Sequence, residues 1–184
     1  ILYLLQDMQD FELYGTVRAV VSVCDSMNYV TEPEDLEYVF ALVNNYLDPG
    51  GLFIFDMNTI HKYRDVIGDR TIAEDREDGS FIWENSYDSE NALNVYELAL
   101  FLPREDGLYE KCEEEHVQKA YSIEEVKVMI AKAGMELVAV YDAYTHTPGD
   151  ENCERLTFIA REHGKSAEND YHGNIPERAR HTEE

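Results

Sequence analysis

The chain has 184 residues, of which 44% are hydrophobic and 11% aromatic, a composition typical of a folded globular protein rather than a disordered chain. Its 15 basic and 39 acidic residues give a net charge of −24, which argues against nucleic acid or an anionic membrane as a main partner, because both attract basic patches. No apolar run approaches the roughly 20 residues of a membrane span, and the N-terminus lacks the pattern of a signal peptide, so we expect a cytoplasmic protein.

The first predicted element is an apolar run at residues 1–5, which turns polar over residues 6–10 and therefore predicts a buried strand ending in a loop. The sequence opens without a methionine and inside this strand, and we expect further chain upstream. After a short connection, residues 17–24 are mostly apolar and predict a second buried strand.

A helix and another strand follow. Residues 33–47 carry apolar side chains at helical spacing, and the Pro-Gly-Gly sequence at 49–51 ends the helix and leads into an apolar strand at 52–55. This strand–helix–strand order indicates a parallel sheet covered on both faces. Ligands bind beyond the carboxyl ends of such strands, where residues 25–29 and 56–59 would lie side by side.

The pattern changes after Asn58. Residues 61–67 predict a short helical piece that ends at Gly68. Residues 71–120 contain strand-length segments rich in aromatic and β-branched residues, and turn signals such as Asp78-Gly79 separate them. We therefore expect an inserted antiparallel subdomain, placed where it could act as a lid.

The α/β pattern then resumes. Ser122 and Glu125 have the spacing of a capping box, at the start of a helix that ends at Gly134. Strands at 135–141 and 155–161, joined by a polar loop, predict an antiparallel pair that closes the sheet. The predicted domains are a core of residues 1–70 and 121–162, the antiparallel insertion at residues 71–120, and a disordered tail at residues 163–184.

Four short segments carry a family resemblance. They are Gln6-Asp7-Met8, Asp25-Ser26-Met27-Asn28-Tyr29, Leu47-Asp48-Pro49-Gly50-Gly51-Leu52-Phe53-Ile54-Phe55-Asp56 and Glu154-Arg155-Leu156-Thr157-Phe158. In this order they resemble the class I S-adenosylmethionine-dependent methyltransferases, in particular the small bacterial ones, over residues 1 to about 162. The resemblance implies an α/β fold with a Rossmann-like, mostly parallel sheet and an inserted antiparallel subdomain, and S-adenosylmethionine as the cofactor.

The resemblance also implies roles for single residues. Asp7 and Met8 would lie against the adenine, with the Asp7 carboxylate accepting a hydrogen bond from the exocyclic amine. The residues that would border the methionine end of the cofactor and the methyl-transfer position are Cys24, Asp25, Ser26 and Tyr29.

Candidate acceptor-binding residues lie nearby. Asn28, Asp56 and Asn58 follow the two strands, but such residues also stabilise turns, and Asp25 could equally cap its loop. Trp83, with Tyr87 and Tyr96, could line an acceptor pocket or form the core of the small sheet. No catalytic residue is assigned, because the histidines are candidate bases by residue type only: His61, His116 and His146.

The cysteines do not suggest a disulfide framework or a metal site. Cys24, Cys112 and Cys153 are odd in number, scattered, and lack the spacing of zinc ligands.

One part of the family pattern is missing. The glycine-rich turn that cradles the methionine portion, and the acidic residue that binds the ribose, have no counterpart in this sequence. We therefore expect the parent protein to transfer a methyl group to a small-molecule acceptor, and this chain alone to bind the cofactor weakly or not at all. The absent strands would leave the edge of the strand at 17–24 unpaired, open either to residues 1–5 or to a second copy in a homodimer.

Two other classes of function remain open at this point. The chain could be a non-catalytic binding or regulatory module on a methyltransferase scaffold. It could also belong to another nucleotide-dependent α/β enzyme, such as a dehydrogenase. That class needs the same glycine-rich turn, so the absence of the turn from this sequence does not distinguish a dehydrogenase from a methyltransferase.

Overall fold

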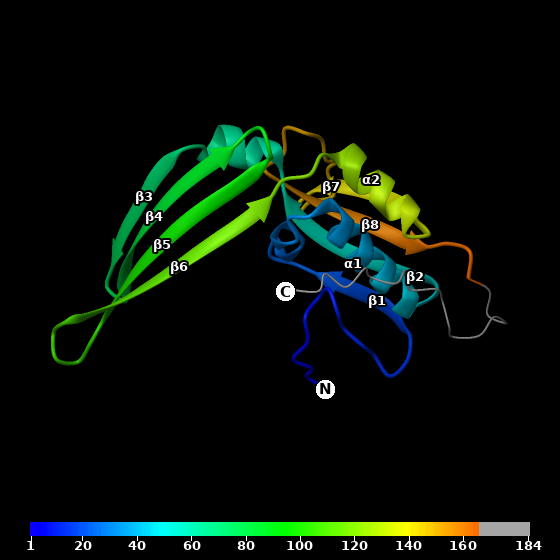
Figure 1. Cartoon of the computed structure of the whole chain (residues 1–184), viewed down its shortest axis with the longest axis horizontal. Helices are drawn as coiled ribbons and strands as arrows, with labels where there is room; N and C mark the ends of the chain where they lie inside the picture. Colours follow the sequence, from blue (N-terminus) through cyan, green and yellow to red (C-terminus); the bar gives the residue numbers. More distant parts are fainter. Residues whose placement is uncertain (166–184) are drawn as a thin grey trace, which may run out of the picture.

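The computed structural model describes residues 1–165, which form two four-stranded sheets and four helical segments. The first sheet has the spatial order β1 (Val17–Ser22), β2 (Leu47–Asn58), β8 (Arg155–Glu162) and β7 (Met135–Asp142). The second has the order β3 (Arg70–Arg76), β4 (Gly79–Asp88), β5 (Leu93–Pro103) and β6 (Tyr109–Lys119). The helical segments are η1 (Ser26–Tyr29), α1 (Pro33–Tyr46), η2 (Lys62–Ile67) and α2 (Ile123–Lys132). Figure 1 shows the second sheet projecting from one end of the first.

The first sheet is less parallel than predicted. β1 and β2 pair in parallel, whereas β8 pairs antiparallel with both β2 and β7. β1, β2 and β7 thus run in one direction, but β8 lies between β2 and β7, so a single neighbouring pair is parallel. Residues 143–154, which join β7 to β8, contain no helix, and a connection without a crossover helix is typical of antiparallel neighbours. The mixed α/β architecture with a parallel pair is confirmed.

Aromatic side chains fill the core between the first sheet and its helices. α1 and α2 cover the same face of this sheet (Figure 1). The ring of Phe40 in α1 lies 5.6 Å from that of Phe53 and 5.1 Å from that of Phe55, between ring centroids. Phe158 of β8 stacks on Phe55 at 5.1 Å. Since side chains alternate along a strand, Phe53 and Phe55 face the helices while Ile54 faces away.

Among residues 1–165, no helix combines the length and the apolar character needed to cross a bilayer.

The helix boundaries follow local sequence signals. The Ser122 hydroxyl accepts a hydrogen bond from the backbone N–H of Glu125, whose carboxylate accepts one from the Ser122 N–H, which confirms the capping box. Beyond α2, Gly134 adopts a φ of 78° that favours glycine. α1 ends one residue before the prediction, because Leu47 already pairs with Val17 as the first residue of β2.

The prediction of a buried strand at residues 1–5 is wrong. These residues form no strand in the structure, and Ile1 and Leu5 are fully exposed. The physical reason is that an apolar run becomes a strand only by backbone pairing, and no strand among residues 1–165, the edge strand β1 included, pairs with this run. β1 is also not buried on both faces: Val21 is paired with Ile54, on the face of the sheet that α1 and α2 do not cover, and is 60% exposed.

The second sheet is an antiparallel meander, as the alternating pattern after Asn58 predicts. The turn signals fall between its strands, with Gly79 opening β4 and Gly107 at the tip between β5 and β6. The predicted helical piece before it is a single π-helical turn, η2, ending at Gly68. The predicted boundaries of an independent subdomain stay a prediction. The predicted disordered tail lies, from residue 166 onward, outside the described residues.

Candidate functional site

The carboxyl ends of β1 and β2 meet, as predicted from the strand–helix–strand order. Asp56, at the end of β2, is buried, and its carboxylate accepts hydrogen bonds from the backbone N–H groups of Cys24 at 3.3 Å and Asp25 at 2.7 Å. Cys24 and Asp25 have φ values of 63° and 49°, the left-handed region that residues with side chains rarely adopt. Asp56 therefore holds a strained loop in one conformation by satisfying two of its N–H groups.

One cation bridges the two carboxylates. Arg155, the first residue of β8, lies 2.7 Å from an Asp25 oxygen and 3.3 Å from an Asp56 oxygen. Burial lowers the pKa of Arg155, but the hydrogen bond to Asp25 and the charges of both carboxylates outweigh burial, so the net pKa is raised. Asp25 and Asp56 are thus engaged within the protein, which favours a loop-organising role for both.

A chain of buried hydrogen bonds ties this loop to the second sheet. Gln118 of β6 donates to Asp25 at 2.7 Å and accepts from the Tyr63 hydroxyl at 2.8 Å. The side-chain amide of Asn58 donates to the same hydroxyl at 3.1 Å. Burial raises the pKa of Tyr63 far above its usual value, so this hydroxyl stays protonated and keeps donating. Asn58 therefore helps to hold the two sheets together, through Tyr63 and Gln118.

Asn28 has a similar structural position. It is completely buried in η1, and its amide donates to the carbonyl oxygens of Asn58 and Lys119, at 3.1 and 2.8 Å. Its side-chain oxygen accepts from the Asn58 N–H at 2.9 Å. All these bonds are internal, which favours a role in joining the loop to β2 and β6 over the predicted contact with an acceptor.

An apolar cavity of about 340 Å³ lies at the edge strand, beside the carboxyl end of β1. Met8 and Ser26, two of the predicted cofactor-binding residues, both line it, together with Ser22, Val23 and Met27. The structure therefore brings the predicted adenine segment next to the loop that follows β1. Asp7 itself is exposed, and its side chain accepts from the backbone N–H of Gln9 at 2.8 Å, so it shapes the turn.

The remaining predicted residues gather where η1 meets the second sheet. The exposed Tyr29 hydroxyl lies within hydrogen-bond distance of Tyr96 and His116, which are neighbours on β5 and β6. Trp83 packs against Tyr96, with ring centroids 4.9 Å apart. The rings of Tyr29, Tyr96 and Trp83 thus form an aromatic surface beside the Asp25 loop, which we call the aromatic wall.

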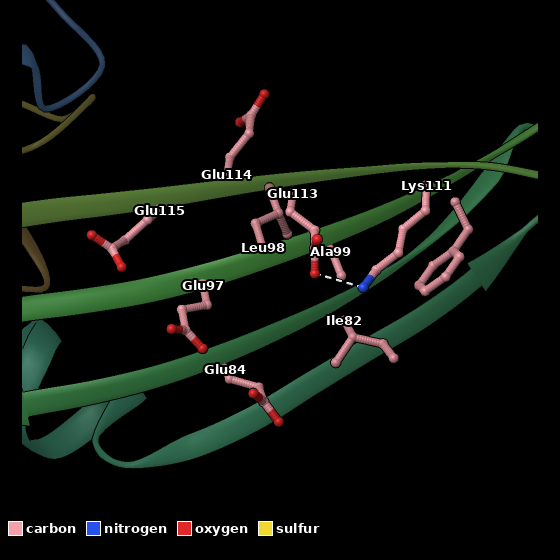
Figure 2. Close-up of a pocket in the computed structure, with 10 residues that line it drawn as sticks. Ile82, Glu84, Glu97, Leu98, Ala99, Lys111, Glu113, Glu114 and Glu115 are labelled. Carbon is pink, nitrogen blue, oxygen red and sulfur yellow. Dashed lines mark hydrogen bonds and ion pairs between the residues drawn. The ribbon is translucent and has the colours of Figure 1, made fainter.

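A second concave surface lies elsewhere on the second sheet. This groove has a volume of about 480 Å³, and five of its ten lining residues are glutamates. Figure 2 shows Lys111 toward one end, paired with Glu113. Glu97 lies directly across from Glu84 on one neighbouring strand and from Glu115 on the other, and all three are exposed. None of the predicted site residues lines this groove, and like charges in register are typical of a solvated face.

Within residues 1–165, no three His, Cys, Asp or Glu side chains gather as metal ligands.

Three important residues were missed by sequence reasoning: Arg155, Gln118 and Tyr63. Arg155 stands out as a cation at the start of an apolar strand, a signal that could have suggested a carboxylate partner. Gln118 and Tyr63 carry no such signal, because their contacts depend on how β6 and η2 pack against the first sheet.

Comparison with known proteins supports the family resemblance. No family model matches the chain. It is 32% identical over 162 residues to the Bacillus subtilis (strain 168) protein named "Putative methyltransferase YqeM", covering 88% of this chain and 65% of that protein. A solved structure of an S-adenosylmethionine-dependent methyltransferase from Clostridium acetobutylicum has a TM-score of 0.81 at 26% identity, over 86% of this chain and 63% of that one.

More distant structures share the fold alone. S-adenosylmethionine-bound CalS10, an amino pentose methyltransferase from Micromonospora echinaspora, has a TM-score of 0.64 at 17% identity, over 85% of this chain and 63% of that one. The chain thus spans a little under two-thirds of the length of the proteins it matches. In sequence and in fold, this chain is similar to proteins named as S-adenosylmethionine-dependent methyltransferases.

Proposed function

We propose that the protein to which this chain belongs transfers a methyl group from S-adenosylmethionine to a small-molecule acceptor, in the cytoplasm. The observation that carries the proposal is the cavity beside the carboxyl end of β1, where Met8 and Ser26 lie together. These residues come from two separate segments of the family resemblance, and their meeting at one cavity is what a shared cofactor site requires.

Methyl transfer depends more on the positions of the two reactants than on the chemistry of single residues. Methyl transfer from a sulfonium to a nucleophile needs in-line placement of the two partners, and orientation alone can supply much of the rate. The strained loop at Cys24 and Asp25 is held by Asp56, so its backbone is ordered before any ligand binds. The methionine end of the cofactor would lie against this loop, and the acceptor would lie between the loop and the aromatic wall of Tyr29, Tyr96 and Trp83.

The proposed acceptor is a small molecule because the charge of −24 disfavours nucleic acid. The similar proteins named above are all methyltransferases, which gives the dehydrogenase alternative no support. The alternative of a non-catalytic module on the same scaffold predicts no methyl transfer at all, so an assay of methyl transfer distinguishes it from an enzyme.

The test uses the full-length protein. Calorimetry with S-adenosylmethionine should show saturable binding that Met8→Ser weakens, because the thioether side chain that lines the cavity is shortened and made polar. Val128→Ser is the matched control, since this exposed residue lies on α2, outside that cavity. Equal affinity in the Met8 variant and the wild type would remove the cavity from the cofactor site. Binding without release of S-adenosylhomocysteine in the presence of small amines and alcohols would favour the non-catalytic module.

A further inference from the structure

A directional hydrogen-bond chain runs through the aromatic wall. The Tyr29 hydroxyl lies 2.8 Å from His116 Nδ1 and 3.1 Å from the Tyr96 hydroxyl. On the other side of the imidazole, His116 Nε2 lies 3.2 Å from a carboxylate oxygen of Glu114. The Tyr96 ring stacks on the imidazole with centroids 4.5 Å apart, which fixes the plane of the ring.

Elementary hydrogen-bond chemistry sets the direction of this chain. An ionised carboxylate can only accept, so His116 Nε2–H must be the donor to Glu114. Neutral His116 then carries no hydrogen on Nδ1, which accepts from the Tyr29 hydroxyl. The Tyr29 oxygen in turn accepts from Tyr96, since its single hydrogen is already used. The chain thus leaves a basic nitrogen aimed at the hydroxyl of Tyr29.

The position of the chain links it to the proposed transfer site. Tyr29 ends η1, the turn that begins immediately after the strained Cys24–Asp25 loop. His116 lies two residues before Gln118 on β6, so both side chains are on the same face of the strand, and Gln118 contacts Asp25 directly. Tyr29 is 41% exposed and the His116 side chain 26%, so a small molecule can reach the hydroxyl while the imidazole is partly shielded.

We propose that Tyr29 and His116 form a proton relay that takes the proton from the amine or hydroxyl group of the methyl acceptor. The proposal rests on the methyl-transfer function proposed above. The lone pair of the acceptor attacks the methyl carbon, and the carbon–sulfur bond breaks with its electron pair remaining on sulfur. The acceptor proton passes to the Tyr29 oxygen as the Tyr29 proton passes to His116 Nδ1. The resulting imidazolium is stabilised by Glu114 and later releases its proton to solvent.

The charged surroundings of His116 are consistent with this role. The titratable groups that contact it are Tyr29 from η1, Tyr96 from β5 and Glu114 from its own strand. Burial, the hydrogen bond to Tyr29 and the nearby negative charges of Asp25 and Glu114 raise the pKa of Tyr96, so Tyr96 remains a hydrogen-bond donor and does not compete for the proton. Among the described residues that contact His116, Glu114 supplies a negative charge next to Nε2, which stabilises the imidazolium.

The first test examines the relay in this chain without any acceptor. Nitrogen-15 NMR of histidine-labelled protein should show neutral His116 as the Nε2–H tautomer, and Tyr29→Phe should shift the Nδ1 resonance. His61, whose Nδ1 lies 2.9 Å from Asp65 on η2, serves as an internal control that should not respond to the Tyr29 change. An Nδ1–H tautomer of His116, or no response to Tyr29→Phe, would overturn the relay whatever the protein methylates.

The second test measures S-adenosylhomocysteine release by the full-length protein with a panel of small amines and alcohols. His116→Asn keeps an acceptor near the Nδ1 position but cannot take up a proton, so kcat should fall at least about a hundredfold while the KM for S-adenosylmethionine stays unchanged. Tyr29→Phe should do the same, and His61→Asn should leave kcat unchanged. Unchanged kcat in His116→Asn would overturn the proposal. If the wild type releases no product, the proposed function is contradicted, and the NMR result alone decides whether the relay exists.

Discussion

At the scale of single residues, Arg155 links the carboxylates of Asp25 and Asp56 at the ends of two neighbouring strands. The meeting of Asp25 and Asp56 follows from the topology of strand, helix and strand, because both residues end parallel neighbours. That Arg155 lies between them depends on the register of β8 against β2, in which Asn58 is paired with Arg155. Register across distant strands is set by tertiary packing, so no local pattern could have predicted it.

Removing this cation tests how far the loop depends on it. Arg155→Met leaves Asp25 and Asp56 facing each other without compensation, and we expect the free energy of unfolding to fall by about 3 kcal/mol in urea denaturation. Arg64→Met is the matched control: Arg64 also binds a carboxylate, that of Asp65, but on the exposed surface, and little change is expected. Similar stability losses in the two variants would contradict a special role for Arg155.

The buried Tyr63 hydroxyl predicts a dependence of stability on alkaline pH. Its pKa is raised in the folded state, mainly by burial, whereas the unfolded chain titrates near the usual value of about 10. Above that pH the unfolded state loses a proton that the folded state keeps, so stability falls as pH rises. In urea unfolding between about pH 8.5 and 11, Tyr63→Phe should flatten this fall, and Tyr14→Phe, at a fully exposed tyrosine, should leave it unchanged. An identical slope in Tyr63→Phe and the wild type would show that Tyr63 is not the group responsible.

At the scale of elements, most helices and strands could be predicted, and their pairing could not. The periodicity of α1, the capping box of α2 and the turn signals of the second sheet are all local, and each appears where expected. Residues 1–5 show the limit of this reasoning. Their apolar run has the composition of a strand, but a strand also needs backbone pairing, and no strand among the described residues pairs with this run.

The Pro-Gly-Gly entry to β2 gives a prediction at this scale. A methyl group on Gly51 would lie 2.9 Å from the carbonyl oxygen of Asp48 and 3.1 Å from that of Arg18, so the parallel pairing of β1 and β2 leaves no room for it. We expect Gly51→Ala to lower the free energy of unfolding by about 1 to 3 kcal/mol. Gly15→Ala, where the added carbon meets no atom within 4 Å, should change it by less than about 0.5 kcal/mol. Equal stabilities of the two variants in thermal unfolding would refute this close approach.

At the scale of the whole molecule, the open edge of β1 predicts self-association. Val21 and Val23 are 60% and 54% exposed at this edge, and unpaired edge strands readily recruit another chain. Sedimentation of the 184-residue chain should reveal a dimer that Val21→Lys shifts to monomer, because a charge at an edge strand opposes pairing. Val138→Lys, on β7 at the opposite edge of the sheet, is the control. A chain that stays monomeric at high concentration would contradict the prediction.

The cofactor site is the other prediction at this scale. The glycine-rich turn expected of the family has no counterpart in this sequence, and losing several hydrogen bonds to charged groups, at roughly 1.5 to 3 kcal/mol each, would take a micromolar site beyond the millimolar range. What remains is the cavity beside β1 and the loop that Asp56 orders, and a weak residual affinity should be located there.

Titration of the nitrogen-15-labelled chain with S-adenosylhomocysteine tests this account most directly. We predict backbone shifts confined to Met8 and to the segment from Cys24 to Tyr29, in fast exchange and without saturation below about 1 mM. Shifts confined to the glutamate-lined groove of Figure 2 would contradict the assignment of the cofactor site to the carboxyl ends of β1 and β2, and saturation at micromolar concentrations would contradict the predicted weak binding.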